Sequence, residues 1–123
     1  FILGLPGETE RSLEETIDFA KKLRLDLAQF YCAVPFPGSR LYERALQEGW
    51  IDPPDFSNFN QNTPLMNFPA LPAGVVSRYR ALAYRRFYTS PANVIRALRL
   101  INWMDLRGLF RSMAAFVRWM LKL

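Results

Sequence analysis

Two short apolar runs near the amino terminus predict two buried strands. The first ends at Leu3, and the second covers residues 27–34, which are apolar except at Gln29. Unbroken apolar runs of this length are typical of strands that are covered on both faces. Gly4 and the pair Pro6-Gly7 follow the first run, and they predict that it ends in a tight turn.

A helical pattern separates the two runs. Its apolar positions form one stripe: Leu13, Ile17, Ala20 and Leu23. This spacing predicts a helix from about residue 10 to residue 23, with Thr9 as its N-cap. A strand, a helix and a second strand make a βαβ unit, so we expect the strands to be parallel and the crossover to be right-handed.

The rest of the chain is predicted to be mostly helical. Ser39 is placed to cap a short helix that ends near Gly49. Residues 51–72 hold several prolines among aromatic residues, which favours an ordered loop. Three helices are expected after it. The first carries an apolar stripe from Val75 to Phe87, the second begins at Ser90-Pro91, and the third runs from about residue 105 to residue 123.

Charge is divided unevenly along the chain. The net charge is +5, but residues 1–72 carry six basic and ten acidic residues, whereas residues 73–123 carry ten basic residues and one acidic residue. Four basic residues of the last predicted helix share one stripe: Arg107, Arg111, Arg118 and Lys122. This pattern favours a helix docked on protein with its basic face in water, and leaves open a helix that lies on an anionic membrane. Nucleic acid is a less favoured partner, because the arginines are spread over three helices without a binding motif.

Composition excludes several kinds of site. The 123 residues include no histidine and one cysteine, Cys32, so neither a disulfide framework nor a Ser-His or Cys-His dyad is available. On a buried strand, Cys32 is expected to be a small core residue. No apolar run approaches the length of a membrane span. The chain begins within an apolar run, without methionine, and we interpret it as a piece of a larger protein.

The turn after the first strand is the first candidate for chemistry. Gly4 would let a ligand or another backbone approach closely at the carboxyl end of a parallel strand, where ligands bind in α/β proteins. A phosphate site is disfavoured, because the loop has no lysine and Glu8 stands where the anion would be. On the residues alone, a well-formed turn with a capped helix is the favoured interpretation.

Two motifs resemble the second half of the core of radical S-adenosylmethionine (SAM) enzymes. The first is Phe-Ile-Leu-Gly-Leu-Pro-Gly-Glu-Thr at residues 1–9, which matches the pattern that ends the fifth barrel strand in that superfamily. The second is the P-x-P-G-S-x-L-Y sequence at residues 35–42, which resembles the segment after the sixth strand. Further on, Phe87-Tyr88 followed by Pro91 resembles the extension of the cobalamin-binding subgroup, with Ser90 where that subgroup usually has arginine.

The resemblance implies an α/β fold. Residues 1–50 would form the last two strand-helix units (β-α-β-α) of a partial (β/α) barrel. Residues 51–72 would be a proline-rich ordered loop, and residues 73–123 a basic α-helical C-terminal extension.

It also implies a cofactor site. In relatives, the residues that correspond to Ile2 and Gly4 lie against the adenine of SAM, with Leu5 beside them. The end of the sixth strand contacts the same adenine, which indicates Tyr31, Cys32 or Ala33. The [4Fe-4S] cluster of the family is held by C-x-x-x-C-x-x-C, which is absent here, so one cysteine cannot hold the cluster. No catalytic residue and no metal ligand is expected in this chain.

Two functions are therefore in competition. In the first, the chain supplies the adenine-side wall and a helical cap to an enzyme that cleaves SAM reductively, with cobalamin-dependent methyl transfer or cyclisation as outcomes. Its partners would be the N-terminal remainder of the polypeptide and a small-molecule or lipid-like substrate. In the second, the chain is a non-catalytic interaction module that binds an anionic membrane or an acidic partner. A cytoplasmic protein is expected, with peripheral contact on the inner face of the membrane left open.

Overall fold

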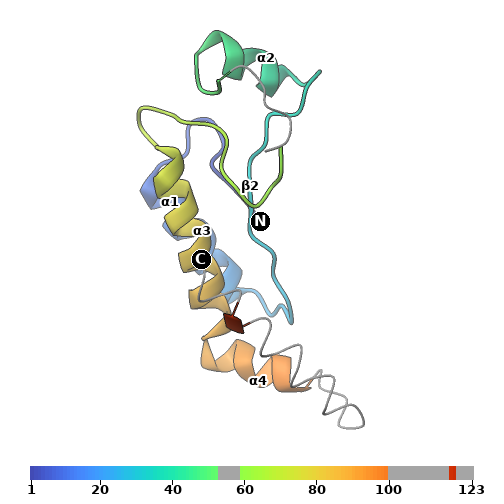
Figure 1. Ribbon diagram of the computed structural model, residues 1–123. Helices are drawn as coiled ribbons and strands as arrows, with labels where there is room; N and C mark the ends of the chain where they lie inside the picture. The colour runs from blue at the N-terminus through green and yellow to red at the C-terminus, as the bar shows by residue number, and fades with distance from the viewer. Residues whose placement is uncertain (53–58, 100–116, 119–123) are drawn as a thin grey trace.

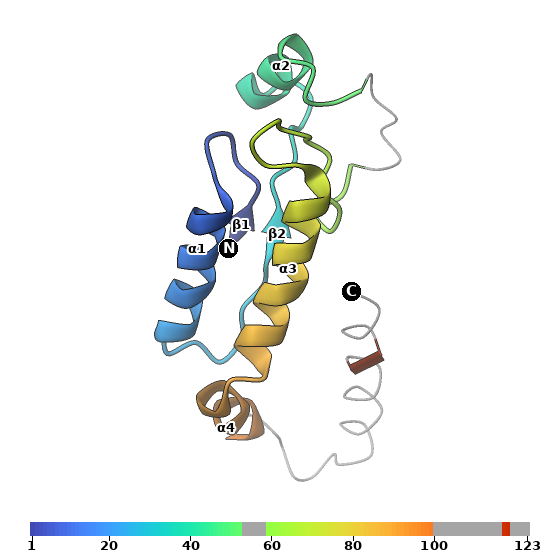
Figure 2. The ribbon, with the colours of Figure 1, turned by 90° about the vertical axis from the view of Figure 1, so that its left-hand side faces the viewer.

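The computed structural model describes residues 1–52, 59–99 and 117–118, and these form a layer of helices against a small sheet. The elements in chain order are β1 (Ile2–Leu3), α1 (Glu10–Lys22), β2 (Tyr31–Cys32), α2 (Arg40–Gln47), α3 (Ala73–Tyr88) and α4 (Pro91–Arg99). Figure 2 shows α1 and α3 side by side in front of the two strands, with α2 at one end and α4 at the other. None of the described helices is long and apolar enough to cross a membrane.

The two strands form a parallel pair, as the βαβ pattern predicts. Ile2 lies opposite Tyr31, and Leu3 lies opposite Cys32. The Tyr31 N–H donates to the Phe1 carbonyl at 2.9 Å, and the Ala33 N–H donates to the Leu3 carbonyl at 2.7 Å. The α/β class is thus confirmed. A barrel is not formed by the described residues, whose sheet has two strands.

Only one face of this sheet is covered by described helices. Leu3, Phe30 and Cys32 are buried on the side of α1 and α3, whereas Ile2 and Leu27 are exposed. The expectation that both apolar runs are buried on two faces is therefore wrong for this chain. Side chains alternate between the faces of a strand, so the face without a helix leaves Ile2 and Leu27 exposed and Tyr31 half-buried.

Local signals place α1 as expected. The Thr9 hydroxyl accepts the Ser12 N–H and the Ser12 hydroxyl accepts the Thr9 N–H, which completes a capping box. Leu13, Ile17 and Ala20 are buried in the core to which α3 also contributes. The acidic Glu10 in the first turn and two lysines in the last turn complement the helix dipole.

The short helix α2 and the loop after it are joined through Trp50. Ser39 caps α2, and Gly49 follows its end with a φ of +66°, both as the sequence predicts. The Trp50 ring packs edge-on against Phe68, 4.7 Å between centroids, and the Arg44 guanidinium lies over it. In the described part of the proline-rich loop, Met66, Phe68 and Leu71 are buried, so this part is ordered by its own apolar side chains.

A row of three polar side chains on α3 follows the outer edge of β2. The Arg80 Nε donates to the Phe30 carbonyl at 2.9 Å, and the Phe30 N–H donates to the Tyr84 hydroxyl at 3.2 Å. The Tyr88 hydroxyl accepts the Ala28 N–H at 3.2 Å and donates to the Ala28 carbonyl at 2.8 Å. We call Arg80, Tyr84 and Tyr88 the edge ladder.

The spacing of the edge ladder fits the strand. Four residues of α-helix rise by about 6.0 Å, and two residues of strand rise by about 6.6 Å. Side chains at every fourth position of α3 therefore meet every second residue of the extended chain. The row continues at Cys32, whose N–H donates to the Gln61 carbonyl at 2.8 Å. The N–H and C=O groups of Ala28 and Phe30 and the N–H group of Cys32 are therefore all paired along this edge.

The C-terminal region differs from the expected pattern. Helix α4 begins at Pro91, and the Ser90 carbonyl accepts its first backbone N–H bonds, as predicted. Its apolar stripe is not buried, however, because Asn93 occupies the inner face instead. The helix predicted for residues 105–123 lies outside the described residues except for Val117 and Arg118, which are helical.

The edge ladder can be tested by removing single hydroxyl groups. Tyr84→Phe should lower the free energy of unfolding by about 1 to 2 kcal/mol, because the buried Phe30 N–H loses its acceptor. Tyr31→Phe is the matched control, since its exposed hydroxyl bonds only Gln29 among the described residues, and it should change stability by less than about 0.5 kcal/mol. Urea denaturation measures both values. Equal values for the two variants would contradict the role of the ladder.

Candidate functional site

The candidate site lies at the carboxyl ends of β1 and β2, where Gly4 and Leu5 follow one strand and Ala33 follows the other. The strands are parallel, so these ends meet at one edge of the sheet. Ligands of α/β proteins bind outside this edge. The βα turn after β1 therefore decides what the edge can accept.

Glu8 closes that turn with its own side chain. One oxygen of its carboxylate, Oε2, accepts the Gly4 N–H at 2.6 Å and the Leu5 N–H at 2.8 Å. The Glu8 N–H donates to the Leu5 carbonyl at 3.1 Å, and Gly7 has a φ of +90°, as the predicted type II turn requires. Two amide groups that could bind an anion are thus occupied by a carboxylate, which agrees with the sequence argument against phosphate.

Gly4 is held close to helix α3. It has a φ of +83°, and a Cβ atom added there would lie 3.0 Å from Cγ1 of Val76. This distance is shorter than a normal carbon contact, so the absent side chain makes room for α3. The C-terminal helical region consequently contacts the turn that carries the candidate site.

The six residues that the resemblance selects differ in what they expose. Ile2 and Leu5 are 51% and 42% exposed, and Tyr31, paired with Ile2, is half-buried. Cys32 and Ala33 are buried, and their N–H groups are already bonded within the chain. Gly4 is buried beneath Val76. The structure thus brings these residues to one end of the sheet, and their contact with adenine stays a prediction.

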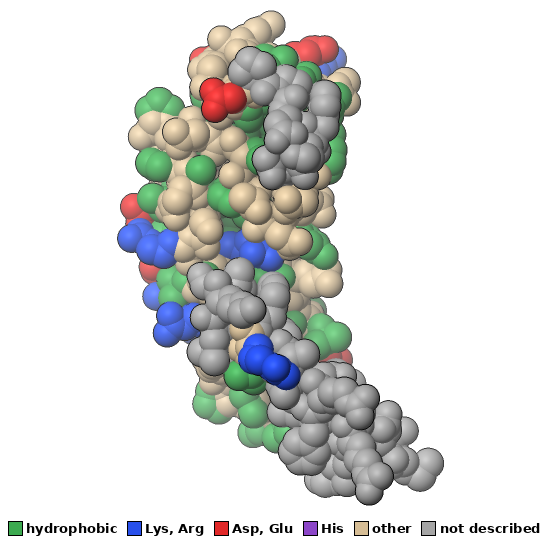
Figure 3. Space-filling model, in the orientation of Figure 1, with side chains coloured by type: hydrophobic (Ala, Val, Ile, Leu, Met, Phe, Trp, Pro, Cys, Tyr) green, Lys and Arg blue, Asp and Glu red, His purple; other side chains and the backbone are tan. Residues whose placement is uncertain are grey.

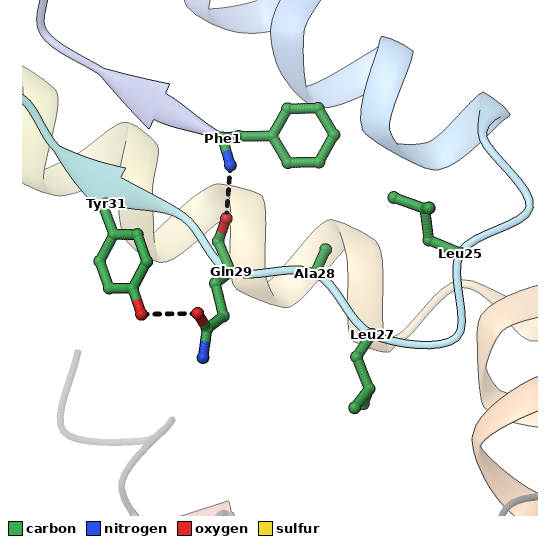
Figure 4. Close-up of a pocket in the computed structure, with 6 residues that line it drawn as sticks. All are labelled: Phe1, Leu25, Leu27, Ala28, Gln29 and Tyr31. Atoms are coloured by element: carbon green, nitrogen blue, oxygen red, sulfur yellow. Dashed lines mark hydrogen bonds between the residues drawn. The ribbon is translucent and has the colours of Figure 1, made fainter.

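Gln29 is a polar residue of the exposed face that sequence analysis did not select. The Tyr31 hydroxyl donates to Gln29 Oε1 at 2.6 Å (Figure 4). The bond leaves the amide NH₂ of Gln29 at the surface, where Figure 4 shows it on the side away from Phe1. The signal that could have found it is its position as the one polar residue in the run 27–34.

Two cavities open on the described surface. One of about 450 Å³ lies at the amino ends of the strands, and one of about 360 Å³ lies beside the turn after β1. The smaller is closer to the expected chemistry, because ligands bind at the carboxyl ends of parallel strands. The larger is lined by Phe1, Leu25, Leu27, Ala28, Gln29 and Tyr31 (Figure 4). The smaller is lined by Pro6, Gly7, Glu8, Thr9, Arg44, Trp50, Phe68, Pro69 and Ala70.

Cys32 has the properties of a core residue. Its side chain is buried, and burial raises the pKa of its thiol, although the charge of Arg80 opposes this shift. A protonated, enclosed thiol is a poor nucleophile and a poor metal ligand. In residues 1–52, 59–99 and 117–118 there is also no group of three or more acidic, cysteine or histidine residues that could hold a metal ion.

Comparison with known proteins finds relatives whose names state an enzymatic activity. The chain is 36% identical over 115 residues to an uncharacterized methyltransferase of Pyrococcus horikoshii, and this match covers 90% of the chain and 25% of that protein. It is 35% identical over 92 residues to the anaerobic magnesium-protoporphyrin IX monomethyl ester cyclase of Cereibacter sphaeroides, covering 75% of the chain and 15% of the cyclase. Its relatives are enzymes.

A third relative adds another methyl transfer reaction. The cytidylyl-2-hydroxyethylphosphonate methyltransferase of Streptomyces wedmorensis is 27% identical over 78 residues, which is 58% of the chain and 15% of that enzyme. The chain thus spans a quarter or less of the length of these relatives. No family model and no solved structure matches the chain.

The contact between Gly4 and Val76 predicts unequal effects at two glycines of the turn. Gly7→Ala should cost about 1 kcal/mol of stability, because alanine is strained at positive φ but meets no atom within 4 Å. Gly4→Ala should cost about 1 to 3 kcal/mol more, because its Cβ also collides with Val76. Thermal or urea denaturation gives both values. If Gly4→Ala is no worse than Gly7→Ala, α3 does not press on this turn.

The thiol of Cys32 should be unreactive in the folded protein. At pH 8 a disulfide reagent such as DTNB should modify it at least about 100-fold more slowly than in denaturant, because the thiol is buried and its pKa is raised. Absorbance of the released thiolate measures the rate. Rapid modification without denaturant would show that Cys32 is accessible and would reopen a chemical role for it.

Proposed function

We propose that the chain is the C-terminal portion of a radical SAM enzyme, in which it supplies the adenine-side wall of the SAM site and a helical cap. The observation that carries the proposal is the turn after β1, where the motif residues Gly4 and Glu8 form a closed turn between two exposed apolar side chains, Ile2 and Leu5. The similarity to methyltransferases and a cyclase supports an enzyme of this kind.

The adenosine part of SAM fits this turn. Adenine is flat and uncharged, with apolar faces, so the exposed side chains of Ile2 and Leu5 are suitable contacts for it. The Glu8 carboxylate makes the same turn unsuitable for phosphate groups, which SAM lacks. When bound, SAM supplies the radical or the methyl group of the reaction, whereas these residues bind and orient its nucleoside.

The [4Fe-4S] cluster does not fit the described residues. Cys32 is the one cysteine of the chain, and its thiol is enclosed by the core. The cluster ligands would therefore come from the N-terminal remainder of the polypeptide. The exposed edge of β1 is a suitable place for that remainder to join the sheet, because no described strand pairs with it, whereas the edge of β2 is closed by α3.

Cobalamin has weaker support within the chain. Phe87 and Tyr88, on which the resemblance to the cobalamin-binding subgroup rests, pack on Phe30 and bond Ala28. Their role here is structural. Use of cobalamin, for methyl transfer or cyclisation, is thus supported by the similarity of sequence alone. A small-molecule or lipid-like substrate and a cytoplasmic location remain part of the proposal.

Binding of SAM to the complete protein tests the proposal. With the protein purified under anaerobic conditions, Leu5→Ser should weaken SAM binding by about tenfold, because an apolar contact with adenine is worth about 1.5 kcal/mol or more. Equilibrium dialysis with labelled SAM measures the dissociation constant. Phe19→Ser is the matched control, because Phe19 is similarly exposed but lies on α1, away from the turn. The affinity of this variant for SAM should be unchanged.

Two results would contradict the proposal. One is a complete protein that does not bind SAM, or whose Leu5→Ser variant binds it with unchanged affinity. The other is a complete gene that encodes no C-x-x-x-C-x-x-C motif before residue 1. The missing motif can be read from sequence alone and would exclude the enzyme class, as would a complete protein that does not bind SAM. Unchanged affinity of the Leu5→Ser variant would instead move the adenine away from β1.

A further inference from the structure

Helix α4 turns its polar side toward the protein. Asn93 is buried, its Nδ2 donates to the Phe87 carbonyl at 3.1 Å, and its Oδ1 accepts from Arg96 Nη1 at 2.9 Å. The Phe87 carbonyl belongs to the last turn of α3, which has carbonyl groups without helical partners. A polar anchor thus fixes the rotation of α4 about its own axis.

The opposite side of α4 is apolar and exposed. Val94, Ile95 and Leu98 are 39%, 53% and 51% exposed. At 100° per residue they fall within an arc of about 100° on the helix. In a helix of a globular protein the apolar arc normally faces the core. In α4 the arc faces outward instead, and an exposed apolar surface of this kind marks a contact with a membrane or with another protein.

The half of the chain that carries the apolar arc is basic. Residues 73–123 carry ten basic residues and one acidic residue, and α4 itself carries Arg96 and Arg99 and no acidic residue. Figure 3 shows most of the blue side chains at the level of α1 and α3, with red side chains among them, and further red side chains at the α2 end. Val117, next to Arg118, is also an exposed apolar residue.

We propose that α4 rests on an anionic lipid surface, with Val94, Ile95 and Leu98 entering the interface. An apolar arc on a helix whose charged residues are all basic is typical of helices that lie in the plane of a bilayer, where the arginines contact anionic headgroups. An anionic bilayer offers charged headgroups for the arginines and an apolar interior for the arc at the same place, so we take lipid as the occupant and leave an acidic protein as an outcome of the test. This inference does not depend on the SAM site.

Sedimentation with lipid vesicles tests the proposal on the complete protein. Vesicles with about 30 mol% phosphatidylglycerol should bind it, and pure phosphatidylcholine vesicles should bind at least about tenfold less. Raising the salt from about 0.1 M to about 0.5 M should weaken binding, because the basic residues are then screened. Leu98→Asp should lower the bound fraction at least about fivefold, because it places a like charge at the anionic surface.

Leu46→Asp is the matched control. Leu46 is 41% exposed but lies on α2, at the other end of the molecule, so its substitution should leave binding to vesicles unchanged. Circular dichroism and the melting temperature establish that Leu98→Asp is folded, and Leu98→Ser serves as a milder second variant with the same expected direction. Binding that ignores lipid charge, or that persists in both Leu98 variants, would overturn the proposal. So would a fall in melting temperature without any change in vesicle binding, because the arc would then be covered by protein.

Discussion

The hydrogen bonds from the edge ladder of α3 to the outer edge of β2 constrain the rest of the structure. A strand edge normally pairs with another strand, and an unpaired edge loses hydrogen bonds or binds a foreign chain. Here Arg80, Tyr84 and Tyr88 take the place of a neighbouring strand. Because one helix serves successive strand residues, α3 must run along the strand, and this direction brings its first turn over the turn after β1. The contact of Val76 with Gly4 follows from that alignment.

The closed edge also determines on which side the small sheet can be extended by another strand. Pairing of further strands is prevented at β2, whereas the other edge of β1, the one away from β2, has no partner strand among the described residues. The motif residues lie on and after β1, so a remainder that joined at this edge would place its own groups beside them. Helix α3 closes the outer edge of β2 and packs against the turn that Glu8 closes, so it helps to form the candidate site.

Local sequence signals predicted the helices and strands, but not which of their faces are buried or which distant residues they bond. Thr9, Ser39 and Pro91 start helices because capping depends on a few neighbouring residues. The exposed face of the sheet was missed, because an unbroken apolar run does not say which neighbours cover it. The edge ladder was missed for a similar reason: Arg80, Tyr84 and Tyr88 are long polar side chains that normally reach solvent, and their partners are about 50 to 60 residues away in sequence.

The sequence predicted the turn after β1 in the candidate site, because the residues that form this turn are neighbours in one loop. Gly4, Gly7 and Glu8 act within one loop, and their residue types already exclude a phosphate cradle. Glu8 explains why the exclusion holds in the structure: its carboxylate fills the amide groups, so a ligand at this rim meets a neutral backbone and apolar side chains instead of free donors. Such a surface discriminates against anionic ligands through desolvation and repulsion. A flat uncharged base would lose little hydration there, which is the physical reason for proposing a nucleoside, and not a nucleotide, at this turn.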